Sequence, residues 1–261
     1  PIDLVMPELI ETLRSGTNAV LIASPGAGKT TRVPLAMLDE PWLRGQRILM
    51  LEPRRLAARA AARYMAQSIG ENVGETVGYR VKMDAKVGPH TRIEVITEGI
   101  LTRMLQEDPS LGEVGLIIFD EFHERNLYAD LGLALGLQAK SLFREDLRIL
   151  VMSATLDAEP VAALLGDAPV IVSEGRTFPV KTCFLPRRLE GRIEPAVVKC
   201  IRQALSDDKG DILVFLPGAG EIRRVEMLLG ESGLEQGVKI APLYGALSQE
   251  VQDRAIQPGR P

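Results

Sequence analysis

The fold is decided by the stretch Ala19-Val20-Leu21-Ile22-Ala23-Ser24-Pro25-Gly26-Ala27-Gly28-Lys29-Thr30-Thr31. Its first five residues are apolar, as in a strand that is buried on both faces, and helical spacing begins after Gly28. The glycines between them allow a tight turn whose backbone N–H groups can face an anion in front of the helix. This order of strand, turn and helix predicts an α/β domain with a phosphate-binding loop.

Further apolar runs alternate with helical segments over the first two thirds of the chain. The other predicted strands are Ile48–Glu52, Ile93–Thr97, Leu116–Asp120, Ile149–Ser153 and Val170–Ser173. The segments Leu56–Ser68 and Asp130–Ser141 have helical spacing and are rich in alanine and leucine. This rhythm predicts an open, doubly wound parallel sheet that binds its ligand at the carboxyl ends of the strands.

The pattern changes near residue 175, where Gly175 and Pro179 interrupt it and a β-prone run, Val180–Leu185, follows. A second cycle then begins, with helices predicted near Pro195–Leu205 and Gly220–Leu229 and strands at Ile212–Leu216 and Val238–Leu243. We therefore predict domains at residues 1–175 and 176–261, and we expect the second to be incomplete because no closing element follows.

Composition narrows the protein class. The 261 residues have a formal net charge of −4, so any contact with nucleic acid has to use local arginines and backbone amides rather than bulk charge. No run of 18 apolar residues occurs, and Pro1 is not followed by a signal-peptide pattern, so we expect a cytoplasmic protein without a membrane segment.

Cysteine and histidine usage argues against a metal cluster. Cys183 and Cys200 lie in apolar segments and are expected to be buried, reduced thiols, although a disulfide or a metal pair stays open. Only His90 and His123 are present, with no Cys/His cluster around them, so no zinc site is expected.

The glycine-rich turn carries the nucleotide hypothesis. Lys29 is expected to reach the β and γ phosphates, and the Thr30 hydroxyl to ligate Mg²⁺. The position of the usual leading glycine holds Ala23, which ends the strand and is not expected to touch phosphate. The alternative is a glycine-rich turn with a chance lysine. The predicted phosphate-binding residues are Ser24, Pro25, Gly26, Ala27, Gly28, Lys29, Thr30 and Thr31.

A second signal is the acidic pair at the end of the strand Leu116–Asp120. Asp120 and Glu121 would lie at the ligand-binding edge, where Asp120 holds the Mg²⁺ shell and Glu121 orients or deprotonates the attacking water. Thr30, Asp120 and Glu121 are thus the predicted metal-site residues. Taken alone, an Asp-Glu pair after a strand is as often a solvated turn; beside a phosphate-binding loop it is far more specific.

Two further polar groups fall on the same edge. His123 lies two residues after Glu121 and either satisfies a local hydrogen bond or links the acidic pair to a neighbouring domain, the role that we favour. Ser153-Ala154-Thr155 follows the strand at Ile149–Ser153, and its hydroxyls can also cap the next helix, as can Asp157.

Taken together, five motifs resemble the DEAH/RHA group of superfamily 2 helicases. In chain order they are Gly26–Thr31, Glu52–Ala58, Thr97–Leu101, Asp120–Arg125 and Ser153–Thr155. Gly175–Val180 also resembles the start of that group's second domain, and Leu51–Arg59 with Phe122 is most similar to the bacterial HrpB-type helicases. The resemblance implies two RecA-like domains, ATP and Mg²⁺ as cofactors, and single-stranded nucleic acid, with a leaning to RNA, as partner.

The resemblance also implies residue roles. Arg54, Arg55, Thr97 and Gly99 match motifs that contact the nucleic-acid backbone, although Arg55 could equally form a surface ion pair. Ser153, Ala154 and Thr155 match the motif that couples hydrolysis to domain movement. In the second domain, Pro217 and Gly218 match a motif that faces the nucleic acid, although Pro-Gly is also an ordinary turn.

Two departures from the family qualify these roles. The arginine that usually stacks on adenine falls on Tyr64, with Arg63 beside it, and the opposing aromatic falls on Ile256, so loose base selectivity is expected. The later motifs that supply arginine fingers, worth about 10³–10⁵ in rate, are not in this sequence. We therefore expect this chain alone to bind nucleotide, to hydrolyse it slowly and not to unwind duplexes.

The leading hypothesis is an ATP-driven helicase or translocase, expected to be monomeric. Nothing in the sequence distinguishes the 2′-hydroxyl, so DNA stays open as a substrate. Two alternatives are an NTPase switch that regulates a protein partner without translocation, and a degenerate nucleotide-binding scaffold. Intact Lys29, Thr30, Asp120 and Glu121 argue against the scaffold.

Overall fold

The computed structural model describes residues 1–155, 158–175, 179–185, 191–207, 209–234 and 237–256. The chain divides into two units, Pro1–Pro179 and Val180–Pro261, and each is described by itself. The segment expected to begin the second domain includes residues 176–178, which lie outside the described residues.

An eight-stranded sheet forms the centre of the first unit, in the order β4-β3-β5-β2-β6-β7-β1-β8. All neighbours are parallel except β3 and β4. The strands are β1 Asn18–Ala23, β2 Arg47–Leu51, β3 Val77–Val81, β4 Asp84–Lys86, β5 Ile93–Ile96, β6 Val114–Phe119, β7 Arg148–Ser153 and β8 Val170–Ser173. The predicted doubly wound α/β sheet is confirmed, and its six predicted strands all form.

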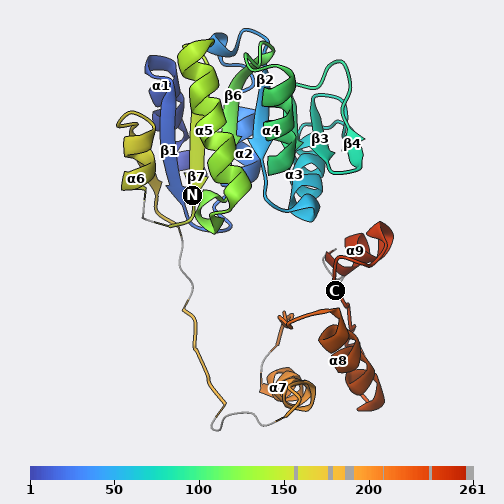
Figure 1. The fold of residues 1–261 in the computed structure, drawn as a ribbon. Coiled ribbons are helices and arrows are strands. Elements are labelled where there is room, and N and C mark those ends of the chain that lie inside the picture. Colours follow the sequence, from blue (N-terminus) through green and yellow to red (C-terminus); the bar gives the residue numbers. More distant parts are fainter. Residues whose placement is uncertain (156–157, 176–178, 186–190, 208, 235–236, 257–261) are drawn as a thin grey trace. The chain divides into compact units, whose positions relative to one another are not determined.

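Helices cover both faces of this sheet (Figure 1). On one side lie α1 Ile2–Ser15, α2 Lys29–Ala36, the 3₁₀ turn η1 Pro41–Leu43 and α3 Arg55–Ser68. On the other lie α4 Glu98–Glu107, α5 Leu127–Leu142 and α6 Glu159–Leu164, and the 3₁₀ turn η2 Phe122–Glu124 follows β6. None of the helices in the described ranges is long and apolar enough to cross a bilayer.

Strand β2 shows why the apolar runs are continuous rather than alternating. Met50 packs into the core that contains α1 to α3, and its neighbour Leu49 packs into the core that contains α4 to α6. Both side chains are 0% exposed, so each contributes about 1.5–3 kcal/mol of burial free energy. A strand covered on both faces therefore needs an apolar residue at every position.

The second unit contains α7 Glu194–Asp207, α8 Ala219–Glu231 and α9 Gln249–Ile256. The first two enclose a small core of Ile201, Val225 and Leu229, and Arg224 of α8 pairs with Glu194 of α7. The predicted helices near Pro195–Leu205 and Gly220–Leu229 are thus present as α7 and α8.

Two strand predictions in this unit are wrong: Ile212–Leu216 and Val238–Leu243 form no strand. The β-prone run Val180–Leu185 forms none either. A strand exists only where a neighbouring strand satisfies its backbone groups, and these segments have no such partner among the described residues. Apolar side chains of these segments are exposed to solvent, and Phe215 is 87% exposed.

The cysteine prediction is also corrected in this unit. Cys183 and Cys200 are exposed free thiols rather than buried ones. The apolar residues around both cysteines indicated burial, but the segment around Cys183 forms no strand and Cys200 is an exposed residue of α7.

The β3–β4 hairpin depends on a missing side chain at Gly78. A Cβ there would lie 2.4 Å from the carbonyl oxygen of Lys86 in the paired strand, a contact that backbone atoms cannot relieve. We expect Gly78→Ala to destabilise the first unit by about 1–3 kcal/mol in denaturant unfolding. Gly136→Ala is the control, because its Cβ would meet Ile117 at an ordinary 3.6 Å. Equal stability of the two variants would contradict this account.

Candidate nucleotide and nucleic-acid site

The phosphate-binding loop connects β1 to α2 as predicted from the sequence. Gly26 and Gly28 have φ angles of 76° and 95°, the left-handed region that glycine enters without strain. The Ala27 N–H donates to the Ser24 carbonyl at 3.1 Å, which closes the turn. Helix α2 begins at Lys29, so the loop ends at a helix N-terminus and suits an anion.

Lys29 and Glu121 contact each other directly. The Lys29 ammonium lies 2.8 Å from Glu121 Oε1, and the Lys29 side chain is only 4% exposed. A buried ammonium is costly unless an anion compensates its charge. The glycine-rich turn and the acidic pair are therefore side by side at the carboxyl edge of the sheet. Glu121 supplies the anion that compensates the charge of the Lys29 ammonium.

Asp120 has the geometry of a metal ligand. Its carboxylate is buried, and Oδ1 accepts the Glu121 N–H at 2.8 Å. Oδ2 is buried and has no hydrogen-bond partner in the described residues. Burial raises the pKa of Asp120 to about 6, while Thr30 and Lys29 act to lower it. An orphaned carboxylate oxygen beside a threonine hydroxyl fits the oxygen-ligand preference of Mg²⁺.

Glu52, which follows β2, is a third carboxyl group at this edge and is buried like Asp120. Burial raises its pKa to about 8, and the negative charges of Asp120, Glu121 and Glu124 add to the shift. At neutral pH Glu52 is therefore mostly protonated. Its partial neutrality limits the repulsion that several adjacent carboxylates would otherwise create.

His123 connects the acidic pair to the end of β7. Its Nδ1 lies 3.3 Å from Glu121 Oε2 and accepts the Ala154 N–H at 3.3 Å. The Thr155 N–H in turn donates to the Ser153 hydroxyl at 3.3 Å. His123 thus has a local partner within its own unit; its expected link to a neighbouring domain stays a prediction. Helix α6 begins after Ala158 without a side-chain cap, so Thr155 does not cap it, and Asp157 lies outside the described residues.

Tyr64 and Thr31 line one pocket of about 570 Å³. The other lining residues are Asp3, Met6, Arg32, Leu35, Ala36, Ser68 and Ile69. Tyr64 is 61% exposed, and Arg32 pairs with Asp3 at 2.7 Å on the same wall. An aromatic ring beside the helix that follows the phosphate loop suits the stacking of a nucleobase.

The predicted backbone-contact residues of the first unit also lie at strand ends. Arg54, the N-cap of α3, and Arg55 are both exposed, and Arg54 pairs with Glu124. Thr97 is the N-cap of α4, and Gly99 in its first turn is exposed. The N-terminus of α3, with its two exposed arginines, and the N-terminus of α4 form a polar rim suited to phosphate groups. In the second unit, Pro217 is exposed and Gly218 is the N-cap of α8.

A family model described as DEAD/DEAH box helicase matches residues 5–164. The chain belongs to this helicase family. The resemblance to DEAH/RHA helicases inferred from its motifs is therefore confirmed.

Similar helicases cover nearly all of the chain. HrpB of Escherichia coli strain K12, named an ATP-dependent RNA helicase, is 48% identical over 258 residues, which are 99% of this chain and 32% of that protein. The corresponding helicase HrpA of Borreliella burgdorferi is 35% identical, covering 97% of this chain and 31% of that protein. The chain thus spans about a third of these relatives.

A crystal structure of the E. coli DEAH/RHA helicase HrpB superimposes with a TM-score of 0.92 at 47% identity. The match covers 100% of this chain and 33% of that one. Together with the strand order, it confirms the predicted RecA-like class of the helicase sheet.

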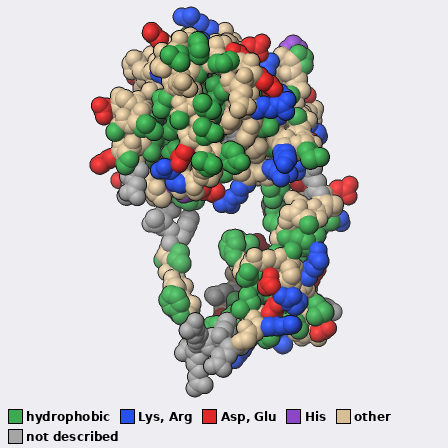
Figure 2. All heavy atoms as spheres, viewed as in Figure 1, with side chains coloured by type: hydrophobic (Ala, Val, Ile, Leu, Met, Phe, Trp, Pro, Cys, Tyr) green, Lys and Arg blue, Asp and Glu red, His purple; other side chains and the backbone are tan. Residues whose placement is uncertain are grey.

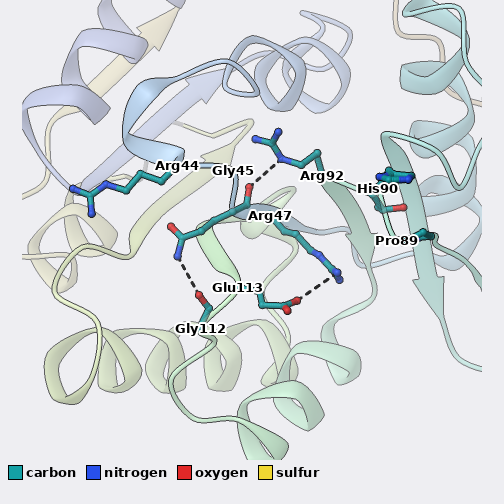
Figure 3. Close-up of a pocket in the computed structure, with 10 residues that line it drawn as sticks. Arg44, Gly45, Arg47, Pro89, His90, Arg92, Gly112 and Glu113 are labelled. Atoms are coloured by element: carbon teal, nitrogen blue, oxygen red, sulfur yellow. Dashed lines mark hydrogen bonds and ion pairs between the residues drawn. The ribbon is translucent and has the colours of Figure 1, made fainter.

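A separate pocket of about 620 Å³ lies at the opposite, amino-terminal edge of this sheet (Figure 3). Arg47 points toward Glu113, 3.4 Å away, and Arg92 donates to the carbonyl oxygens of Gln46 and Leu38. The visible face of the first unit mixes basic and acidic side chains without one large basic surface (Figure 2).

Sequence reasoning missed three features of the helicase site. Glu52 was seen only as part of a motif, because its neighbours Asp120 and Glu121 come from a distant strand. The Arg54–Glu124 pair joins residues 70 positions apart. The sequence also did not predict the direct contact of Lys29 with Glu121, because it assigns Lys29 to the phosphates and Glu121 to the attacking water.

The raised pKa of Glu52 predicts a pH-dependent stability. Between the ordinary pKa of 4.5 and about 8, the folded protein holds a proton that the unfolded chain has lost. The free energy of unfolding therefore falls as pH rises through this window. Glu52→Gln removes the cost of ionising a buried carboxyl group above this window. The substitution should therefore raise Tm by several degrees at pH 8.5, without nucleotide or Mg²⁺, but not at pH 4.5. The exposed Glu8→Gln is the control; a gain independent of pH would contradict this explanation.

Proposed function

We propose that this chain is the nucleotide-binding part of an ATP-dependent motor that moves on single-stranded RNA. The observation that supports this most is the direct contact of Lys29 with Glu121, beside the orphaned oxygen of Asp120. These groups share one sheet edge with the exposed arginines of α3. A phosphate-handling site and a nucleic-acid rim on one edge suit the coupling of hydrolysis to movement.

In the proposed reaction, triphosphate enters the loop Ser24–Gly28 and its oxygens replace Glu121 at the Lys29 ammonium. Glu121 is then free to orient the attacking water, as phosphoryl transfer requires positioning and charge neutralisation. Thr30 and Asp120 would hold Mg²⁺, which neutralises phosphate charge. The contact of His123 with Ala154 connects the acidic turn to the proposed coupling segment Ser153–Thr155.

RNA is proposed as the partner because HrpB of E. coli and HrpA of B. burgdorferi are named ATP-dependent RNA helicases. In this proposal Arg54, Arg55, Thr97, Gly99, Pro217 and Gly218 contact the backbone of the strand. The enzyme is proposed to be monomeric and cytoplasmic. Residues 1–261 alone are expected to turn over more slowly than a chain of the relatives' length.

The test is the ATPase rate of a chain extended to the relatives' length, with and without single-stranded RNA. RNA should raise kcat. A nucleotide-dependent switch without translocation would hydrolyse ATP at a rate independent of RNA, and that outcome would remove the motor from the proposal. The same measurement on residues 1–261 checks the expected slower turnover.

Two substitutions separate binding from chemistry at this site. Glu121→Gln should keep or improve ATP affinity, because the Lys29 ammonium loses its competing anion, and should lower kcat by about 10²-fold or more. Lys29→Ala should weaken ATP binding by at least about tenfold, since charge-assisted hydrogen bonds contribute about 1.5–3 kcal/mol each. Titration with a fluorescent ATP analogue and the steady-state rate measure the two effects. Weaker ATP binding by Glu121→Gln would contradict the exchange at Lys29.

Base selectivity tests the proposed role of Tyr64. An aromatic ring stacks on every base, so we expect ATP, GTP, CTP and UTP to compete within about tenfold of each other. Tyr64→Ala should weaken all four by a similar factor, about 1–3 kcal/mol. Strong ATP preference in a competition assay would instead require base-specific hydrogen bonds.

A further inference from the structure

Arg54, at the carboxyl edge of the sheet, is already paired with an anion. It is the N-cap of α3, and its Nη2 donates to Glu124 Oε1. The Arg54 side chain is nevertheless 71% exposed, whereas the side chain of Glu124 is 30% exposed. A guanidinium with most of its surface in solvent and one carboxylate partner can exchange that partner for another planar or tetrahedral oxyanion.

Glu124 belongs to the same turn as Glu121. It is the last residue of η2, and its N–H donates to the Glu121 carbonyl at 2.9 Å. Both ends of the turn have positive φ angles, 50° at Glu121 and 39° at Arg125. Non-glycine residues hold that conformation at a cost, so the turn depends on its side-chain contacts for its position.

We propose that Glu124 pairs with Arg54 at the position where a nucleic-acid phosphate binds. RNA binding then replaces Glu124 by phosphate at Arg54 and releases the turn that carries Glu121. This inference rests on the proposed function and adds a positioning residue to it. Glu124 does not touch the substrate; it acts through Arg54 on one side and through the backbone of η2 on the other.

The local charges give the exchange a direction. Glu124 lies close enough to Glu52 to raise that group's pKa, together with Asp120 and Glu121. When a phosphate pairs with Arg54, Glu124 loses its cation while the negative charges of Asp120 and Glu121 remain nearby. Their repulsion of the Glu124 carboxylate then displaces η2. Because coupling is reciprocal, a change that frees the turn also makes Arg54 more available to RNA.

The first experiment measures RNA binding without nucleotide. Fluorescence anisotropy of a labelled oligouridine is followed with the chain extended to the relatives' length. Glu124→Gln should bind about two- to fivefold more tightly, the range expected from removing one competing exposed ion pair. Arg54→Gln should bind more weakly and reduce the slope of log affinity against log salt by about one. A purely structural role for Glu124 predicts unchanged or weaker binding.

The second experiment measures the ATPase rate. Glu124→Gln should have a higher rate without RNA and a smaller factor of stimulation by RNA, because part of the response has already occurred. The exchanged pair Arg54→Glu with Glu124→Arg should restore the RNA-free rate of the wild type but lose most of the stimulation. Failure of the exchanged pair to fold would show as a lower Tm, and Glu124→Gln then decides alone.

The control is another exposed pair of the same kind in the first unit. Arg103 and Glu107 of α4 lie 2.8 Å apart with side chains 76% and 64% exposed, and Glu107→Gln should change neither RNA affinity nor stimulation. RNA affinity and stimulation of Glu124→Gln equal to those of the wild type would overturn the inference while leaving the motor intact. A wild type that neither binds RNA nor responds to it would overturn both.

Discussion

The pair of Lys29 with Glu121 is the contact on which the rest of the site depends. It joins the phosphate loop to the acidic turn across 92 residues of sequence. Breaking such a pair from one side leaves an uncompensated, largely buried charge, at a cost of about 3–5 kcal/mol. In the proposed reaction an incoming triphosphate would avoid this cost, because it supplies the anion that Lys29 loses. The pair thus keeps the loop organised, and the ligand that the loop suits would release it.

The order of the strands explains why these groups meet. Strand β7 lies between β1 and β6, so Ser153 at its end falls between the phosphate loop and Asp120. Strand β2 pairs with β6 on the other side and brings Glu52 and Arg54 beside the acidic turn. Because all four strands are parallel, their carboxyl ends share one edge. A few residues at each strand end are enough to build the site.

The first unit was predictable because its strands are continuous apolar runs and its motifs sit at their ends. Strands β3 and β4 were missed, since Gly78, Arg80 and Asp84 interrupt any apolar pattern. The strand predictions in the second unit were wrong for another reason. Ile212–Leu216 has the composition of a strand, but a strand needs a partner strand, and a local sequence pattern cannot reveal one. Local sequence likewise could not show Glu52 or Glu124 as parts of the site. Glu52 matters because it lies beside the carboxyl groups that follow β6, and Glu124 because it pairs with Arg54, which follows β2.

The charge balance at this edge accounts for several features at once. Four carboxyl groups, Glu52, Asp120, Glu121 and Glu124, face two cations, Lys29 and Arg54. The proton held by Glu52 removes one negative charge, and the two ion pairs remove two more. Asp120 is left with a buried oxygen that has no hydrogen-bond partner in the described residues, and a divalent cation bound there would complete the charge balance. In the proposed mechanism, phosphate groups reach Lys29 and Arg54 by exchanging with Glu121 and Glu124. This exchange would allow a protein with net negative charge to bind polyanions, because each incoming phosphate would replace a carboxylate already paired with its cation.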